Sequence, residues 1–306
     1  MTMLHSSQDT RTSGADTDAY MDERIYAALD LGTNNCRLLI AAPQDHVRRA
    51  NGEAGATAPA IKVFDSFSRV VRLGEGVSTN GVLSADAMER TLGALKACQK
   101  KLSRYKIMGA RFVATEACRR AGNGYDFLKQ VKKETGISID IISSEEEARL
   151  AFLGCSSLLA PGSKRAIVFD IGGGSTELMW IDVERTKNNN RLHEDNTHIT
   201  DWLSIGHGVM NLADRFGGAS FADVAFDDMV RFLVGQLRPF DEANGIGKAI
   251  DDYSVQLLST SGTVTTLAAI HMDLPRYDRA RIDGITLKIS DIRDTIRRLL
   301  AMRPSE

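Results

Sequence analysis

An aspartate and a glycine-rich turn separate two apolar runs at residues 166–181, AIVFDIGGGSTELMWI. The first four of these residues favour a buried strand, and Asp170 follows where that strand leaves the core. Gly172, Gly173 and Gly174 lack a Cβ, so we expect their N–H groups to approach an anion closely and their φ angles to enter regions denied to other residues. The stretch predicts a strand, a turn and a strand that cradle a phosphate, with Asp170 placed to hold a hydrated divalent cation.

The same pattern occurs 140 residues earlier, in YAALDLGTNNCRLLIA at residues 26–41. Asp30 and Gly32 align with Asp170 and Gly172, again between apolar runs. A single glycine turn is also typical of a tight hairpin without a ligand, so one motif alone decides nothing. The repetition is what favours binding, and it predicts two related lobes that face each other across a cleft.

Two further groups of residues could meet an anion. Ser261, Gly262 and Thr263 follow an apolar run and begin a predicted helix, whose first N–H groups are free to bind phosphate. Arg119 and Arg120 follow a short predicted strand and are either exposed surface charge or an anion clamp. Composition alone favours surface charge, because most arginines are exposed.

Three consecutive glutamates begin a predicted helix that Ser143 or Ser144 caps. Acidic residues in a first helical turn usually complement the helix dipole, and we interpret Glu145 and Glu146 in this way. Glu147 is open to a second interpretation. If the helix begins at the cleft, one of these carboxylates can act as general base toward a water that attacks phosphorus, although spacing alone does not choose which.

Composition sets the broad class of the chain. It has 306 residues, of which 43% are hydrophobic, so two domains with proper cores are expected. The net charge of -2 gives no general signature of a nucleic-acid or membrane partner. The four cysteines show no zinc spacing, and no apolar run is long enough to span a bilayer or to form a signal peptide. We therefore expect a cytoplasmic protein with reduced thiols.

Strand and helix signals alternate along the chain and provide the frame for these residues. We expect strands near residues 61–66, 70–73, 112–115, 137–142 and 255–259, and helices over residues 125–135 and 221–237, the latter ending before Pro239. Residues 1–24 are polar and predict a disordered leader. The expected lobes are residues 25–147 and residues 148–306.

Five motifs in this order, ALDLGTNNCRL, ATEACRRAGN, IISSEEEARLAFLG, VFDIGGGSTEL and STSGTVTTLAAI, resemble those of the exopolyphosphatase/guanosine pentaphosphate phosphatase family. The resemblance covers about residues 25 to 290. It implies an α/β fold of two actin-like (ribonuclease H-like) lobes, each a mixed sheet flanked by helices, with an active-site cleft between them. It also implies an exopolyphosphatase, a hydrolase of phosphorus-containing acid anhydrides that releases orthophosphate from the end of polyphosphate with Mg²⁺, Mn²⁺ being the alternative metal.

The resemblance also implies roles for single residues. Glu147 resembles the base that activates the attacking water, and Asp30 and Asp170 resemble the pair that faces the metal and the phosphates. Glu177 resembles an acidic residue that positions metal or water. The residues expected to contact phosphate by motif are Asn34, Asn35, Arg119, Gly172, Gly173, Gly174 and Ser175. Backbone amides, one arginine and a metal would neutralise charge, which is what phosphoryl transfer requires.

Two departures from the family pattern modify these expectations. Asn35 stands where many members have Ser; because Asn can still hydrogen-bond a phosphate oxygen, we expect altered tuning and not loss. Members also normally continue past the final helix of this chain, so we expect the second lobe to be closed differently or truncated, with consequences for the grip on long polyphosphate.

Alternative functions stay open at this point. The substrate could be guanosine pentaphosphate (pppGpp) in place of polyphosphate, or the chain could be a non-catalytic sensor that binds polyphosphate or an alarmone. An actin-like kinase or ATPase is less favoured, because the glutamate of EEEARL suits activation of water. No nucleic-acid or membrane partner is expected, and a homodimer is left open.

Overall fold

The structure is a computed structural model that describes residues 24–44, 60–160, 162–183, 199–216, 223–252 and 255–302. The predicted leader therefore lies outside the described residues, apart from Arg24. The first half contains β1 (Ile25–Leu31), β2 (Asn35–Gln44), β3 (Ala60–Val70), α1 (Val77–Asn80), α2 (Ala85–Leu102), β4 (Ile107–Ala114), α3 (Glu116–Arg120), α4 (Gly124–Thr135), β5 (Asp140–Ile141) and α5 (Ser144–Cys155). The second half contains the 3-10 helix η2 (Ser156–Leu158), β6 (Arg165–Ile171), β7 (Thr176–Asp182), β8 (Ile199–Ile205), α7 (Val209–Arg215), α8 (Asp223–Asn244), α9 (Ile246–Asp251), β9 (Val255–Ser259), α10 (Gly262–His271), α11 (Arg279–Ile282) and α12 (Ile289–Leu300). Across these ranges, no helix is both long and apolar enough to cross a membrane.

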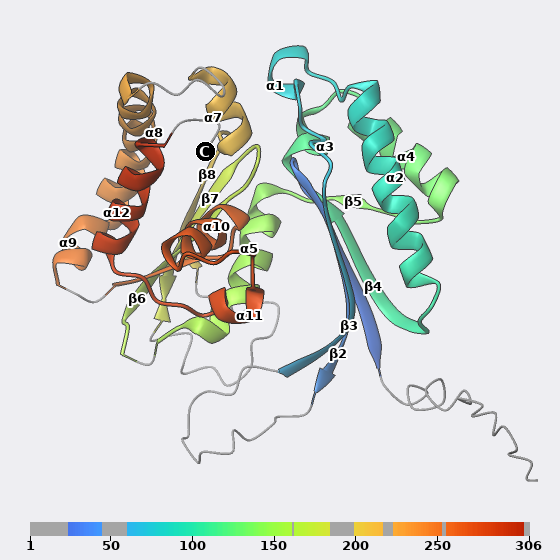
Figure 1. Cartoon of the computed structure of the whole chain (residues 1–306), viewed down its shortest axis with the longest axis horizontal. Coiled ribbons are helices and arrows are strands. Elements are labelled where there is room, and N and C mark those ends of the chain that lie inside the picture. The colour runs from blue at the N-terminus through green and yellow to red at the C-terminus, as the bar shows by residue number, and fades with distance from the viewer. Residues whose placement is uncertain are drawn as a thin grey trace, which may run out of the picture.

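The first sheet has the strand order β3-β2-β1-β4-β5. Alternate residues of β1, among them Ile25, Leu29 and Leu31, are buried in one core with side chains of α2 and α4. These two helices lie on the face of the sheet that is turned away from the second lobe (Figure 1). Residues on the opposite face of β1, such as Tyr26 and Asp30, are therefore directed toward the second lobe.

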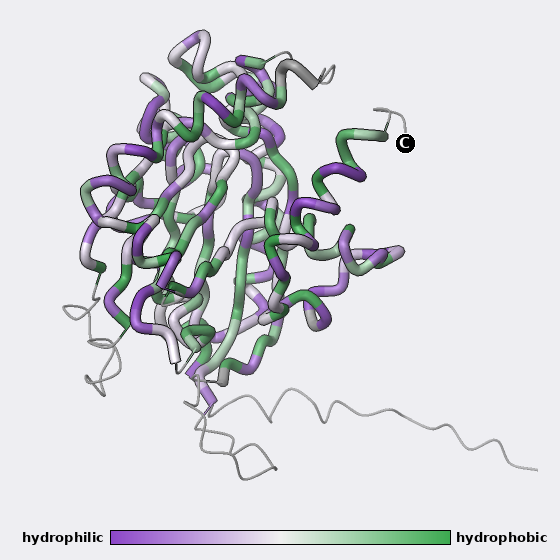
Figure 2. The backbone as a smooth tube through the Cα atoms, turned by 90° about the vertical axis from the view of Figure 1, so that its left-hand side faces the viewer, coloured by the Kyte–Doolittle hydropathy of each residue, from purple (hydrophilic) through white to green (hydrophobic). Residues whose placement is uncertain are grey.

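The second sheet has the order β8-β7-β6-β9 and is covered on both faces. Val168 belongs to a core with Phe152 of α5, whereas its neighbour Ile167 belongs to a core with Phe240 of α8 and Ile246 of α9. This agrees with a strand of continuous apolar residues, since each face needs its own apolar set. The hydropathy view shows hydrophobic segments, drawn in green, within the body of the molecule (Figure 2).

The two sheets repeat one topology. β1 pairs antiparallel with β2 and parallel with β4, and β2 pairs antiparallel with β3. β6 pairs in the same way with β7 and β9, and β7 pairs antiparallel with β8. The repeat predicted from the two Asp-x-Gly motifs is therefore confirmed at the level of the fold, which consists of two lobes, each a mixed sheet flanked by helices.

Some predicted elements differ in length from the structure. The expected strand over residues 137–142 is reduced to Asp140–Ile141, which pairs only with the end of β4. The helix expected to end before Pro239 continues through it to Asn244 as part of α8. Pro lacks an N–H but does not by itself force the chain out of a helix that packing retains. The predicted lobe boundary at residues 147 and 148 falls within α5 and stays a prediction.

Candidate active site

The two glycine-containing hairpins have the same backbone geometry. The N–H of Gly32 donates to the carbonyl of Asn35 at 2.9 Å, and the N–H of Gly172 donates to the carbonyl of Ser175 at 2.9 Å. Both turns therefore join their strands in the same register. That register places Asp30 directly opposite Arg37 in the first hairpin, and Asp170 directly opposite Glu177 in the second.

The turns of the two lobes touch each other. A Cβ built on Gly174 would lie 2.8 Å from Thr33 Oγ1, and one on Gly173 would lie 3.1 Å from the Cβ of Asn34. Neither glycine has a positive φ, and nor does Gly172. The expectation of unusual φ angles is thus wrong. Glycine is needed at Gly173 and Gly174 because residues of the opposite lobe occupy the space that a side chain would fill.

The glycine turn is also attached to α7. The carbonyls of Gly172 and Gly173 accept hydrogen bonds from the N–H groups of Val209 (3.0 Å) and Met210 (2.9 Å). A Cβ on Gly208 would lie 2.3 Å from the Gly172 carbonyl oxygen, so glycine is required there too. In a trans peptide the N–H points opposite to the C=O. The two N–H groups that follow these carbonyls are therefore directed away from α7.

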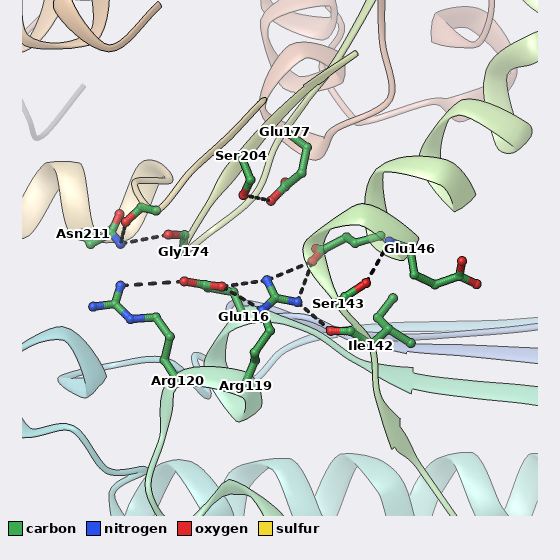
Figure 3. A network of polar contacts seen from close by, with 12 residues as sticks. Glu116, Arg119, Arg120, Ile142, Ser143, Glu146, Gly174, Glu177, Ser204 and Asn211 are labelled. Atoms are coloured by element: carbon green, nitrogen blue, oxygen red, sulfur yellow. Dashed lines mark hydrogen bonds and ion pairs between the residues drawn. The ribbon is translucent and has the colours of Figure 1, made fainter. Parts of the chain in front are cut away.

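Glu147 lies in the first turn of α5 and contacts Arg119. Both terminal nitrogens of Arg119 lie 3.3 Å from Glu147 Oε2. Arg119 also donates to the carbonyl of Ile142 at 2.7 Å (Figure 3). Burial and, next, the charge of Glu177 raise the pKa of Glu147 to about 8, while Arg119 opposes the rise. Arg119 is 22% exposed. The preference for surface charge drawn from composition is therefore wrong for this arginine.

Glu177 is almost fully buried and accepts hydrogen bonds from two hydroxyls. Ser204 Oγ donates to Glu177 Oε1 at 3.1 Å, and Ser175 is the second donor. Burial raises the pKa of Glu177 to about 7 and Asp170 adds to the rise, whereas the two hydroxyls oppose it. The hydroxyl of Ser175, which we expected at the phosphate, is thus directed to a carboxylate.

Asp30 lies close enough to Asp170 for its charge to affect the titration of that residue. Burial raises the pKa of both, and the charge of Asp30 adds to the rise at Asp170. Arg37 opposes the rise at both aspartates, and its Nη1 lies 3.9 Å from Asp30 Oδ2. The structure therefore brings the two predicted aspartates to one site from two lobes, together with a cation.

Arg37 also connects this site to α10. A Cβ on Gly262, the first residue of α10, would lie 3.3 Å from Arg37 Nη2. Ser261 caps α10 through the N–H of Val264, and Thr263 Oγ1 donates to the carbonyl of Ile171 at 3.3 Å. The predicted Ser-Gly-Thr element thus borders the site, although its two hydroxyls serve the protein itself.

The two asparagines of the first turn also make backbone contacts. The carbonyl of Asn34 accepts from the N–H groups of Val71 (2.8 Å) and Arg72 (3.0 Å), and the Asn35 carbonyl accepts from Gly32. These bonds hold the first turn against the chain that follows β3. The phosphate contacts expected of both side chains stay predictions.

Sequence reasoning missed three polar residues of this site. Arg37 could have been found, because it is separated from Asp30 by the same interval that separates Glu177 from Asp170. Ser204 belongs to β8, and only the pairing of β7 with β8 places it beside Glu177. Glu116, whose Oε2 lies 2.6 Å from Arg119 Nη2, could have been found from its position in the motif ATEACRRAGN, three residues before Arg119, a spacing at which helical side chains meet.

The carboxylates can be tested for their fit to a divalent metal. Within the described ranges, no group of three or more His, Cys, Asp and Glu side chains is arranged to hold a metal ion. Mg²⁺ is usually bound by only one or two carboxylates, with water and substrate phosphates completing its shell. Asp30 and Asp170, two carboxylates with mutually unfavourable charge, fit that mode of binding.

The two lobes, each a mixed sheet flanked by helices, meet at a glycine turn and buried carboxylates, an arrangement suited to binding phosphate groups. The sequence profile of the Ppx/GppA phosphatase family matches residues 53–306, and the chain belongs to this family.

Known relatives support this assignment. The chain is 29% identical over 282 residues to a bifunctional 3-dehydroquinate synthase/phosphatase of Fusobacterium nucleatum, covering 91% of this chain and 39% of that protein. The crystal structure of an Aquifex aeolicus Ppx/GppA family member is similar with a TM-score of 0.65 and 26% identity, over 91% of this chain and 79% of that one. The structure of an exopolyphosphatase-like protein is similar with a TM-score of 0.73 and 26% identity, over 92% and 79% of the two chains.

Proposed function

We propose that this protein hydrolyses the terminal phosphoanhydride bond of inorganic polyphosphate and releases orthophosphate. The observation that carries the proposal is Glu147, a carboxylate whose pKa is raised to about 8 beside the buried Glu177 and the guanidinium of Arg119. A general base is most effective when its pKa lies near the working pH, and an ordinary exposed glutamate does not meet that condition.

The other residues account for binding and alignment. The N–H groups directed away from α7 and the guanidinium of Arg37 would bind oxygens of the terminal phosphate. A water held by Glu147 would attack the phosphorus and pass a proton to its carboxylate, while the bond to the bridging oxygen breaks and the shortened chain leaves. A divalent cation, which we propose to be Mg²⁺ held by Asp30 and Asp170 with Glu177 nearby, would supply further neutralisation of phosphate charge.

We propose polyphosphate as the substrate, in preference to other phosphate compounds, for two reasons. The proposed binding groups, backbone N–H groups and a guanidinium, all suit phosphate oxygens, and polyphosphate consists only of phosphate groups. One structural relative is named exopolyphosphatase-like. Guanosine pentaphosphate has the same terminal linkage and is therefore the comparison substrate. The chain spans 39% of the length of the curated relative it matches, so the activity of that whole protein does not decide the choice.

The test is orthophosphate release from polyphosphate and from pppGpp, with and without Mg²⁺. Glu147→Gln keeps the shape of the side chain but removes the base, and we expect kcat to fall by about 10³-fold. The matched control is Glu145→Gln, since Glu145 is an exposed acid in the same helical turn. Near wild-type turnover by folded Glu147→Gln, or faster release from pppGpp than from polyphosphate, would contradict the proposal.

A further inference from the structure

Arg119 is already bound by a carboxylate other than the proposed base. Glu116, the first residue of α3, accepts from Arg119 Nη2 at 2.6 Å and from Arg119 Nε at 3.2 Å (Figure 3). The remaining N–H groups of the guanidinium serve the Ile142 carbonyl and Glu147. An arriving phosphate can therefore reach Arg119 only by displacing one of these acceptors.

The distances indicate which acceptor holds Arg119 most strongly. Glu116 Oε2 lies 2.6 Å from Arg119 Nη2 and 3.2 Å from Nε, whereas Glu147 Oε2 lies 3.3 Å from both terminal nitrogens. Short charge-assisted hydrogen bonds between arginine and a carboxylate are stronger than long ones. The side chain of Glu116 is only 13% exposed, so water screens this pair weakly. Glu116 is the principal anion on Arg119.

Glu116 also lies next to the proposed phosphate cradle. Its Cγ is 3.2 Å from the position of a Cβ on Gly174, and it lines a small cavity between the lobes with Gly173, Gly174, Arg120 and Asn211. Its second oxygen lies 3.7 Å from Arg120 Nη1, whose side chain is 44% exposed. A second cation is thus in place to receive the carboxylate when it leaves Arg119.

We propose that Glu116 is an internal competitor of the substrate, which occupies Arg119 in the free protein and is displaced onto Arg120 when a terminal phosphate binds. Glu116 thereby sets the affinity for phosphate chains without taking part in the reaction. The inference rests on the proposed function for the nature of its ligand. Its consequence is that removing this acid strengthens binding.

The test is calorimetric titration with imidodiphosphate, a phosphate-chain analogue whose P–N–P linkage resists hydrolysis. Glu116→Gln keeps the volume of the side chain but replaces a charged acceptor with a neutral one. We expect its Kd to fall about tenfold relative to the wild type. In turnover assays we expect KM to fall by a similar factor while kcat changes little.

A second background shows whether the effect passes through Arg119. With Arg119→Met present, Glu116→Gln is expected to leave the Kd for imidodiphosphate nearly unchanged, because no guanidinium is released. Glu116→Asp, one methylene shorter, should give an intermediate Kd. The matched control is Glu75→Gln, since Glu75 forms an ion pair with Arg90 at 2.8 Å outside the site and should not alter binding.

The possible results separate this inference from the proposed function. Weaker or unchanged binding by folded Glu116→Gln and Glu116→Asp, or equal strengthening in both Arg119 backgrounds, would overturn it. Strengthening that depends on Arg119 supports it even if no orthophosphate is released, a result that contradicts only the proposed hydrolysis. Thermal unfolding of each variant identifies one that fails to fold.

Discussion

The hairpins β1–β2 and β6–β7 have the same backbone geometry but carry side chains of different charge. Each has an aspartate two residues before the turn glycine. The residue opposite that aspartate is Arg37 in the first hairpin and Glu177 in the second. Arg37 opposes the rise in pKa at both aspartates, whereas Glu177 adds a further buried acid. The same local fold thus serves a neutralised half and an acidic half of one site.

This difference shows how a repeated element can take on two tasks. The backbone of the turn provides amides in either hairpin, so specialisation needs only one changed side chain on the returning strand. On the proposed function, the first hairpin supplies a cation for phosphate oxygens. The second supplies the charge that keeps Glu147 a stronger base. Each of the following changes should affect the two halves unequally.

Among changes to the two hairpins, Arg37→Met is expected to have the largest effect. Without this guanidinium, Asp30 and Asp170 repel an incoming polyanion, and we expect kcat/KM for polyphosphate to fall about 100-fold. Arg111→Met is the matched control, because Arg111 pairs with Asp140 at 2.9 Å on an exposed edge of the same sheet. Equal losses in both variants would show that the difference between the hairpins has no role in catalysis.

A smaller effect is expected from Gly174→Ala in the second turn. Its new Cβ would lie 2.8 Å from Thr33 Oγ1, so the two turns must separate slightly. We expect about tenfold lower kcat/KM and a free energy of unfolding lower by about 1–2 kcal/mol. Gly93→Ala is the control, since nothing lies within 4 Å of its added Cβ on α2. An unchanged melting temperature for Gly174→Ala would argue against close contact of the turns.

The smallest effect is a shift in pH dependence caused by Glu177→Gln. Burial raises the pKa of Glu147 to about 8, and the charge of Glu177 is the next cause. The base acts when deprotonated, so activity should rise with pH through this value. Removing the Glu177 charge lowers the pKa of Glu147, and we expect the rising limb of kcat/KM to move about one unit toward lower pH.

The direction in which the rising limb of kcat/KM shifts with pH tests whether Glu147 is the base. Arg119→Gln removes a cation that lowers the pKa of Glu147, so its rising limb should move the opposite way, toward higher pH. Profiles of kcat/KM against pH for wild type and both variants give the comparison. Limbs that coincide in all three proteins would show that Glu147 is not the titrating base.

Much of the fold could be predicted because it is encoded locally. The two Asp-x-Gly motifs lie between apolar runs, and each of these runs forms a strand, as predicted. The order of these strands then follows from short connections and pairing rules. Five motifs in one order also identified the family, which single motifs could not have done.

The site was harder to predict where one lobe meets the other. The reason for glycine at Gly173 and Gly174 is the presence of Thr33 and Asn34, and nothing in either stretch alone shows that contact. Composition alone favoured surface charge for Arg119, because its partner Glu147 is brought to it by another helix, α5, whereas Glu116 lies in its own helix, α3. Contacts of this kind depend on tertiary packing, which the local sequence does not contain.

The attachment of the glycine turn to α7 has a thermodynamic consequence. Because Gly172 and Gly173 commit their carbonyls to α7, and Gly208 packs against them without a side chain, the peptide planes of the turn cannot rotate independently. Three flexible residues would otherwise lose about 1–2 kcal/mol each of backbone entropy when a ligand ordered them. Folding has already ordered these residues, so on the proposed function a phosphate would bind a preorganised set of amides.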